Sequence, residues 1–417
     1  MQAIVGLGGS AGSIGALKTF FSHMPGDSGL AFVVVLHLSP AYESHLAGVL
    51  QKYTPMPVIQ VSGPIKVEAN CVYVIPPGKH LLTAKGQLVL NELPHEYGKR
   101  MAVDIFFRSL ADTHGGRSIA IVLSGVDGDG AIGIKRIKEQ GGITVAQEPR
   151  EAQYKGMPRS AIDTVMVDWV LPIAEMPRRL LEYQLTQERV RLPKERRFVL
   201  SRLDDSNDEK DLRSIITLLR ARTSHDFSFY NRRTIVRRIG RRMRVSNIEK
   251  LSSYLAFLRL HPHEVMALRQ DLLAPITNFF RDREAFAALA AELPKLFADK
   301  TPGDQMRVWV PGCATGEEVY SIAILLSEGA AKLKAPLSMQ VFATDLDQGS
   351  INMGRAALYP GTITADVSEE RLRLFFSKES AGYRLKRVCA KRRSLPYRTC
   401  SQTRPFRALI LFRAVTC

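Results

Sequence analysis

The sequence predicts an α/β protein in three parts. These are a doubly wound, mostly parallel sheet, a small all-α bundle, and a second, incomplete α/β domain. Strand-like runs that lead into glycine turns and helices alternate through residues 1–183. Apolar residues then recur at helical spacing from 211 to 298. Another strand, glycine turn and helix begin at Met306, and 417 residues suffice for two or three cores.

The first strand and its turn lie at the start of the chain. The apolar residues Ala3–Val5 reach Gly6, and a helical pattern follows from Ser13 to about His23. The turn contains the pattern G-x-S-x-G with Ser10 at its centre. Small neighbours let a serine project from such a strand-to-helix turn, and the helix N-terminus behind it can stabilise an oxyanion. This pattern predicts a nucleophilic serine.

The same turn also matches a nucleotide-binding motif, because Gly6, Gly8 and Ala11 fit G-x-G-x-x-A. That alternative requires an acidic residue about 20 positions later, at the end of the second strand. The second apolar run, 30–38, has His37 near its end instead. The histidine favours the nucleophile over the phosphate turn.

The remaining elements of residues 1–183 continue the alternation of strand and helix. We expect helices at 44–53, 103–114 and 131–140, strands at 58–61, 71–75, 118–123, 143–146 and 166–171, and a hairpin across 80–93. Sheets of this kind bind ligands at the carboxyl ends of their strands.

Three polar residues fall at or just after such strand ends: Ser10, His37 and Asp129. A nucleophile, a general base and a carboxylate that orients the base form a hydrolytic triad. Two simpler explanations remain open. An aspartate in a glycine turn accepts backbone hydrogen bonds there, and a single histidine at a strand end is often structural. The order Ser–His–Asp also differs from the Ser–Asp–His order of α/β hydrolases.

Four segments (GLGGSAGS, VVVLHLSP, LSGVDGDGAIG, and AQEP followed by GMPRSAI) occur in this order within residues 1–183. Together they resemble the catalytic domain of the chemotaxis protein-glutamate methylesterases of the CheB type. The resemblance implies that Ser10 is the nucleophile, His37 the general base and Asp129 the orienting acid. Asp127 is the second choice for the acid.

The chain departs from that family at two positions close to these motifs. Ala11 follows the serine, where the family commonly has threonine, and Val126 stands three residues before the acid, where it has methionine. We expect both to alter oxyanion stabilisation or substrate fit without removing the triad. No receiver domain precedes Met1, so we expect no control by phosphorylation of an attached regulator.

The net charge of +17 is concentrated in a few segments. Ten lysines and arginines and no acid lie in 381–417, which leaves +7 for the rest, so we expect no nucleic-acid partner. No apolar run approaches the roughly 18 residues of a membrane span, and no signal peptide is evident. The five cysteines are scattered without metal-ligand spacing. We therefore expect a cytoplasmic protein with no metal site and no membrane insertion.

The middle of the chain changes character. Residues 184–210 are highly charged and lack apolar periodicity, which predicts a linker, and residues 211–298 predict a helical subdomain. Within it, seven arginines occupy 232–244, opposite apolar residues such as Ile235 and Ile239 at helical spacing. The arginine face is either a solvated surface or a binding surface for an acidic protein or a nucleic acid.

A second α/β pattern covers residues 299–383. A strand at 306–310 enters the glycine turn of PGCATGEEVYS and a helix, and a strand at 339–343 is followed by Asp345. This half-Rossmann order holds a nucleoside, with the terminal acid placed for ribose hydroxyls. Glu317 and Glu318 would repel a phosphate and suit a cationic cofactor such as S-adenosylmethionine. Alternatively, the two acids only stabilise a helix N-terminus.

The helical segments, ITNFFRD, GCATGEEVYS and FATDLD together resemble the chemoreceptor glutamate methyltransferases of the CheR type, across about 211–380. The resemblance implies S-adenosylmethionine as cofactor. It also implies cofactor contacts from Thr277, Arg281, Asp345 and one of the pair Glu317 and Glu318. The arginine-rich helix corresponds to a receptor-contact surface in that family.

Residues 384–417 lose the pattern of that family. Their acid-free composition, rich in arginine and cysteine, is typical of translation in a shifted frame. We therefore expect an aberrant basic tail, a partial cofactor-binding domain over 299–383, and a strand edge that the tail cannot cover.

The sequence thus predicts a chemotaxis signalling enzyme. It would hydrolyse glutamate methyl esters on the cytoplasmic helices of methyl-accepting chemoreceptors, deamidation of glutamine being a second activity, without a cofactor. The fused methyltransferase would use S-adenosylmethionine if it were complete. The alternatives are a generic serine esterase and a non-enzymatic scaffold that binds acidic helices or RNA.

Overall fold

The computed structural model forms two compact units, Met1–Ala274 and Pro275–Cys417. The described residues are 3–37, 44–84, 86–91, 101–190, 207–223, 225–273, 277–298, 305–331, 338–345, 348–359, 361–379, 382–386 and 408–415. Most of the predicted linker (191–206) and of the basic tail (387–407) therefore lies outside them. Among the described residues, no helix is long and apolar enough to cross a membrane.

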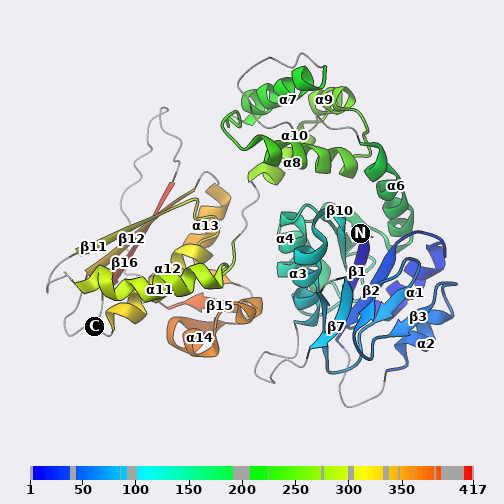
Figure 1. Ribbon diagram of the computed structural model, residues 1–417, viewed down its shortest axis with the longest axis horizontal. Coiled ribbons are helices and arrows are strands. Elements are labelled where there is room, and N and C mark those ends of the chain that lie inside the picture. Colours follow the sequence, from blue (N-terminus) through cyan, green and yellow to red (C-terminus); the bar gives the residue numbers. More distant parts are fainter. Residues whose placement is uncertain are drawn as a thin grey trace. The chain divides into compact units, whose positions relative to one another are not determined.

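A seven-stranded, all-parallel sheet organises the first unit, in the order β10-β9-β8-β1-β2-β5-β3 (Figure 1). Its strands are β1 (Ile4–Gly9), β2 (Ala31–Leu36), β3 (Val58–Gln60), β5 (Val72–Val74), β8 (Ser118–Val122), β9 (Ile143–Gln147) and β10 (Trp169–Leu171). Its helices are α1 (Ser13–His23), α2 (Leu46–Gln51), α3 (Ala102–His114), α4 (Ala131–Glu139), α5 (Gly156–Asp163) and α6 (Met176–Arg189). The doubly wound fold class is confirmed.

Both faces of this sheet are covered because its central strands are apolar throughout. One core joins the strands to α1 and α6 through Phe20, Phe21 and Leu180. The other joins them to α3 and α4 through Phe106 and Ile134. A smaller antiparallel sheet of β4 (Ile65–Lys66), β7 (Gln87–Asn91) and β6 (His80–Ala84) includes the predicted hairpin.

The helical bundle belongs to the same compact unit as this sheet. Its helices are α7 (Asn207–Thr223), α8 (Arg232–Val245), α9 (Leu251–Leu260) and α10 (Pro262–Leu273). They pack around Ile215, Leu219, Ile239, Met243 and Leu268. Before the bundle, α6 continues to Arg189, so the first residues of the predicted linker are helical.

The sequence predicts that the arginines of α8 form an accessible face, and this prediction is wrong for three of them. Arg238, Arg241 and Arg242 are 3%, 0% and 7% exposed, whereas Arg237 is exposed. The helical spacing correctly separates apolar from charged positions. It does not show that carboxylates from other elements cover part of the charged face.

The second unit contains the predicted strand, glycine turn, helix and strand. These are β11 (Gln305–Pro311), α12 (Glu317–Ala330) and β12 (Ser338–Asp345), and β11 pairs in parallel with β12. α11 (Arg283–Ala298) packs through Leu293 and Phe297 on this unit's core, although its sequence pattern continues that of the bundle. Further elements are α13 (Gln348–Ala356), β13 (Leu358–Tyr359), α14 (Glu369–Phe375), β14 (Phe376–Glu379) and β15 (Gly382–Leu385).

The expectation that the tail leaves a strand edge open is wrong. β16 (Ala408–Val415) lies antiparallel to β12, with register pairs from Ser338↔Val415 to Asp345↔Ala408. The segment ALILFRAV is apolar enough to add a strand, even though the arginine-rich residues before it suggest a solvated tail. The sheet order is therefore β11-β12-β16.

Candidate active site

Ser10 follows β1 on a turn built from small residues. A Cβ on Gly8 would lie 2.1 Å from Val103 Cγ1, and Gly12 adopts a left-handed φ of 77° as the N-cap of α1. The Ser10 N–H donates to the Ser124 carbonyl at 3.0 Å, and Ser13 Oγ donates to the Ser10 carbonyl at 2.6 Å. These contacts fix the Ser10 backbone at the N-terminus of α1.

His37 lies beside Ser10 because β1 and β2 are adjacent parallel strands in the register Gly9↔Leu36. Its Nε2 is 2.7 Å from Asp129 Oδ2. Its Nδ1 is 3.4 Å from Asp127 Oδ2. The structure therefore brings together the three predicted residues from the ends of β1, β2 and β8. Asp129 makes the shorter contact with the imidazole ring.

Asp129 is buried and held by three backbone donors. Its Oδ2 accepts from Val103 N–H at 2.9 Å, and its Oδ1 accepts from Asp104 N–H at 2.8 Å and Gly130 N–H at 2.9 Å. Val103 and Asp104 lie in the first turn of α3, whose N-terminus favours negative charge. This arrangement keeps a carboxylate next to His37 and fixes its orientation.

The Val126 backbone contacts the candidate nucleophile, whereas the sequence analysis considered only the Val126 side chain. Its N–H donates to Ser10 Oγ at 3.3 Å. A Cβ on neighbouring Gly125 would come within 2.6 Å of Ser10 Oγ and 2.0 Å of Met157 Sδ, so only glycine fits there. The sequence shows that Val126 replaces the family's methionine in this turn, but it does not predict that the Val126 N–H reaches Ser10 Oγ.

Two further titratable residues surround the triad. Burial, and then the charge of Asp129, raise the pKa of Asp104 well above its ordinary value. Burial lowers the pKa of His80, on β6, although the charge of Asp129 partly opposes the shift. Within the described part of the chain, His80 Nδ1 and Asp104 Oδ2 are buried without a hydrogen-bond partner. Neither residue belongs to a motif.

A second candidate site lies in the glycine turn of the second unit. Asp345, at the end of β12, accepts the Ala314 N–H at 2.7 Å. Glu317 is buried and accepts from Thr315 Oγ1 at 2.5 Å, whereas Glu318 is exposed. Of the two predicted acids, Glu317 thus lies inside the turn.

The segment before α11 contacts this site. The Phe280 N–H donates to Ser321 Oγ on α12 at 3.0 Å, in the segment that contains Thr277 and Arg281. Thr277 Oγ1 is buried and, among the described residues, has no hydrogen-bond partner, while Arg281 is exposed. The buried Thr277 hydroxyl and the Asp345 carboxylate at the end of β12 are polar groups that a nucleoside cofactor could contact.

The described residues contain no group of three or more His, Cys, Asp or Glu side chains that could hold a metal ion. Cys313, in the glycine turn, is buried. Burial, and then the charge of Asp345, raise the pKa of its thiol to about 12. Its sulfur therefore stays protonated near neutral pH and is a poor nucleophile.

Comparison with known proteins assigns all three parts of the chain. Residues 5–180 match the CheB methylesterase family. Residues 210–273 match the all-alpha domain of CheR methyltransferases, and residues 276–408 match their SAM binding domain. The last match extends beyond Arg384, where the resemblance based on motifs ends.

Individual relatives agree with these matches. A putative protein-glutamate methylesterase/protein-glutamine glutaminase of Leptospira interrogans is 34% identical over 190 residues, which are 45% of this chain and 98% of that protein. An uncharacterized 104.1 kDa protein of Rhodobacter capsulatus is 32% identical over 364 residues. That alignment covers 82% of this chain but only 37% of the relative.

Among solved structures, the chain is similar to the Thermotoga maritima CheB methylesterase catalytic domain. The identity is 26% and the TM-score 0.41, over 44% of this chain and 98% of that chain. The family and sequence matches confirm both resemblances found in the motifs. The chain belongs to the CheB methylesterase family and carries the all-alpha and SAM-binding domains of CheR methyltransferases in the same polypeptide.

Proposed function

We propose that the first unit hydrolyses glutamate methyl esters on the cytoplasmic helices of chemoreceptors, in the cytoplasm, through Ser10, His37 and Asp129. The observation that carries the proposal is the 2.7 Å contact between His37 Nε2 and the buried carboxylate of Asp129, beside Ser10. Family membership supplies the substrate class.

The geometry supports a two-step acyl transfer. Ser10 Oγ attacks the ester carbonyl while His37 accepts the serine proton. His37 then donates this proton to the leaving methoxide, which departs as methanol. Asp129, in contact with Nε2, orients the imidazole ring and stabilises the imidazolium that forms when His37 takes the serine proton. Water then attacks the acyl-enzyme with His37 as base, which releases the glutamate and frees Ser10.

The Val126 N–H is our candidate oxyanion donor, because at 3.3 Å from Ser10 Oγ it lies beside the place where the attacked carbonyl would sit. The same steps apply to a glutamine side chain, with ammonia in place of methanol as the leaving group. Deamidation is therefore the second activity that we propose.

Covalent labelling tests the nucleophile. A fluorophosphonate probe should modify Ser10, identified by peptide mass spectrometry, in the folded chain and not after urea denaturation. Labelling of another serine, or equal labelling of the denatured chain, would contradict the assignment.

We further propose that the second unit binds S-adenosylmethionine through Thr277, Arg281, Glu317 and Asp345. The cofactor supplies a methyl group when bound. Asp345 would accept from the ribose hydroxyls, and Thr277 Oγ1 would gain a polar partner. Isothermal titration calorimetry of the full chain with the cofactor tests this proposal, and absence of heat at millimolar cofactor would contradict it.

A further inference from the structure

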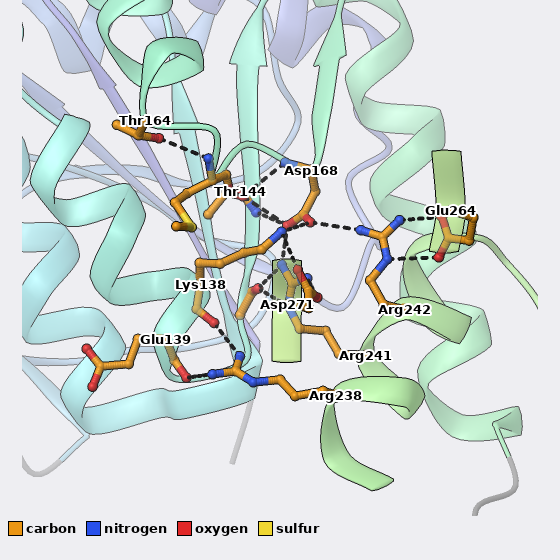
Figure 2. Close-up of polar contacts among 12 residues, drawn as sticks. Lys138, Glu139, Thr144, Thr164, Asp168, Arg238, Arg241, Arg242, Glu264 and Asp271 are labelled. Carbon is orange, nitrogen blue, oxygen red and sulfur yellow. Dashed lines mark hydrogen bonds and ion pairs between the residues drawn. The ribbon is translucent and has the colours of Figure 1, made fainter. Parts of the chain in front are cut away.

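Helix α8 of the bundle holds the carboxyl end of α4 in the methylesterase part (Figure 2). Arg238 donates from Nη1 to the Lys138 carbonyl at 2.9 Å and from Nη2 to the Glu139 carbonyl at 3.1 Å. Arg241 donates from Nε and Nη2 to the Gly142 carbonyl at 3.1 and 2.9 Å. Carbonyls at a helix C-terminus carry partial negative charge, so guanidinium groups match them, even though the Lys138 carbonyl also accepts the Gly141 N–H at 3.1 Å.

A buried network of charges around Asp168 and Asp271 secures this contact, and Arg242 joins it with Nη1 3.6 Å from Asp168 Oδ1. Lys138 Nζ lies 2.6 Å from Asp168 Oδ1 and 3.0 Å from Asp271 Oδ1. Arg241 pairs with Asp168, and with Asp271 Oδ2 at 2.6 Å. Burial alone would raise the pKa of Asp168, but the charges of Arg241 and Lys138 hold it well below its ordinary value. The same cations lower the pKa of Asp271, so both buried aspartates are held as anions by the basic side chains around them.

A reciprocal contact holds the carboxyl end of α8 itself. Arg179 of α6 donates from Nη2 to the Val245 carbonyl at 2.7 Å, and its guanidinium lies 4.9 Å from the centre of the Trp169 ring. The Val245 side chain packs within the core of the methylesterase sheet. Because apolar and ionic contacts combine, the bundle and the sheet share one interface inside the first unit.

The opposite end of α4 leads directly to the catalytic turn. α4 begins at Ala131, after Asp129 and its N-cap Gly130, and comprises nine residues. Near that end, Asp104 Oδ1 accepts the Gly133 N–H at 2.6 Å. Because α4 is short and follows Asp129 directly, we expect a shift at its carboxyl end to be transmitted to Asp129.

We propose that the bundle of α7–α10 is an intramolecular positioning module for the methylesterase: α8 holds α4 by its carboxyl end and thereby sets the contact of Asp129 with His37. Arg238 and Arg241 are positioning residues because they touch neither the substrate nor the reacting atoms. Only the enzymatic test of this proposal, methanol release, depends on the proposed function of the first unit.

Arg238→Met in the full chain is the primary test. It removes two charge-assisted hydrogen bonds at α4 and leaves the ion pairs of Asp168 and Asp271 intact. The expected result is a fall in kcat for methanol release of about 3- to 30-fold at unchanged KM, the range of such coupling energies. Amide hydrogen exchange across 124–139 should accelerate by a similar factor. Arg237→Met, at the exposed neighbour, is the matched control and should change neither readout.

Hydrogen exchange also separates this proposal from the proposed function, because it requires no catalysis. If wild type releases no methanol but Arg238→Met still loosens 124–139, the function fails and the positioning role stands. If circular dichroism shows that Arg238→Met is unfolded, Arg238→Lys takes its place in the test. The lysine ammonium keeps the charge but cannot reproduce the paired hydrogen bonds of the guanidinium to the two carbonyls. Wild-type kcat together with wild-type exchange in a folded Arg238 variant would overturn the positioning role.

Discussion

Asp104 and Asp129 each place a side-chain carboxyl oxygen at the N-terminus of the other's helix. Asp129, which precedes α4, accepts the Val103 and Asp104 N–H groups in the first turn of α3. Asp104, in that turn, accepts the Gly133 N–H in the first turn of α4 at 2.6 Å. The exchange fixes the two helices against each other and places the carboxylate of Asp129 against His37.

This exchange predicts a pH-dependent effect on stability. Because burial and the charge of Asp129 raise the pKa of Asp104 well above its ordinary 3.8, the folded chain retains a proton that the unfolded chain releases above about pH 4. The contribution of Asp104 to the free energy of unfolding therefore falls as the pH rises from 4 toward the folded pKa. Asp104→Asn keeps an acceptor for Gly133 and has no proton to lose.

We expect the stability of Asp104→Asn relative to wild type to increase from pH 5 to pH 8, by at most about 1.4 kcal/mol per pH unit. Urea unfolding at several pH values measures this difference, with Asp27→Asn at an exposed site as the control. A difference that stays constant with pH would show that Asp104 is ionised in the folded chain.

The two aspartates beside His37 are expected to differ in importance. Asp129→Asn replaces the buried anion on Nε2 and should lower kcat by about 10²- to 10⁴-fold. Asp127→Asn weakens the longer 3.4 Å contact with His37 and keeps an oxygen that can accept the Asp129 N–H, so it should cost less than about tenfold. Steady-state methanol release from methylated receptor fragments measures both. A larger loss for Asp127→Asn would reassign the acid.

The backbone of Val126 can be tested separately from its side chain. Val126→Pro removes the N–H that reaches Ser10 Oγ and should lower kcat by about 10²- to 10³-fold, as loss of an oxyanion donor does. Val126→Ala keeps the N–H and truncates a side chain that is 65% exposed, so its kcat should stay near wild type. Equal activities of the two variants, at equal melting temperatures, would remove Val126 from the mechanism.

In the second unit, burial distinguishes the two adjacent glutamates. Glu317→Gln should weaken S-adenosylmethionine binding more than Glu318→Gln, because Glu317 lies inside the glycine turn and Glu318 faces solvent. Calorimetry of both full-length variants gives the ratio of dissociation constants. A greater effect of Glu318→Gln would reverse the assignment.

The positions of Ser10, His37 and Asp129 could be predicted because parallel strands bring their carboxyl ends to one edge of a sheet. Local patterns identify those ends without knowledge of distant contacts. The burial of Arg241 could not be predicted in this way, since its partner Asp168 is 73 residues away. Helical periodicity marks arginine as polar and cannot show which carboxylate from another element neutralises it.

The same limit applies to residues that act through backbone or burial. The role of Val126 depends on an N–H that every residue except proline carries, and Asp104 matters because it is enclosed. The strand β16 was missed because the arginine-rich composition before it outweighed a short apolar run.

The central claim is that Ser10 is the nucleophile of a glutamate methylesterase. Methanol release from methylated chemoreceptor fragments by the full chain and by Ser10→Ala tests it most directly. We predict turnover by wild type and a loss of about 10⁴-fold or more in a Ser10→Ala variant that melts at the wild-type temperature. Undiminished methanol release by that folded variant would contradict the account.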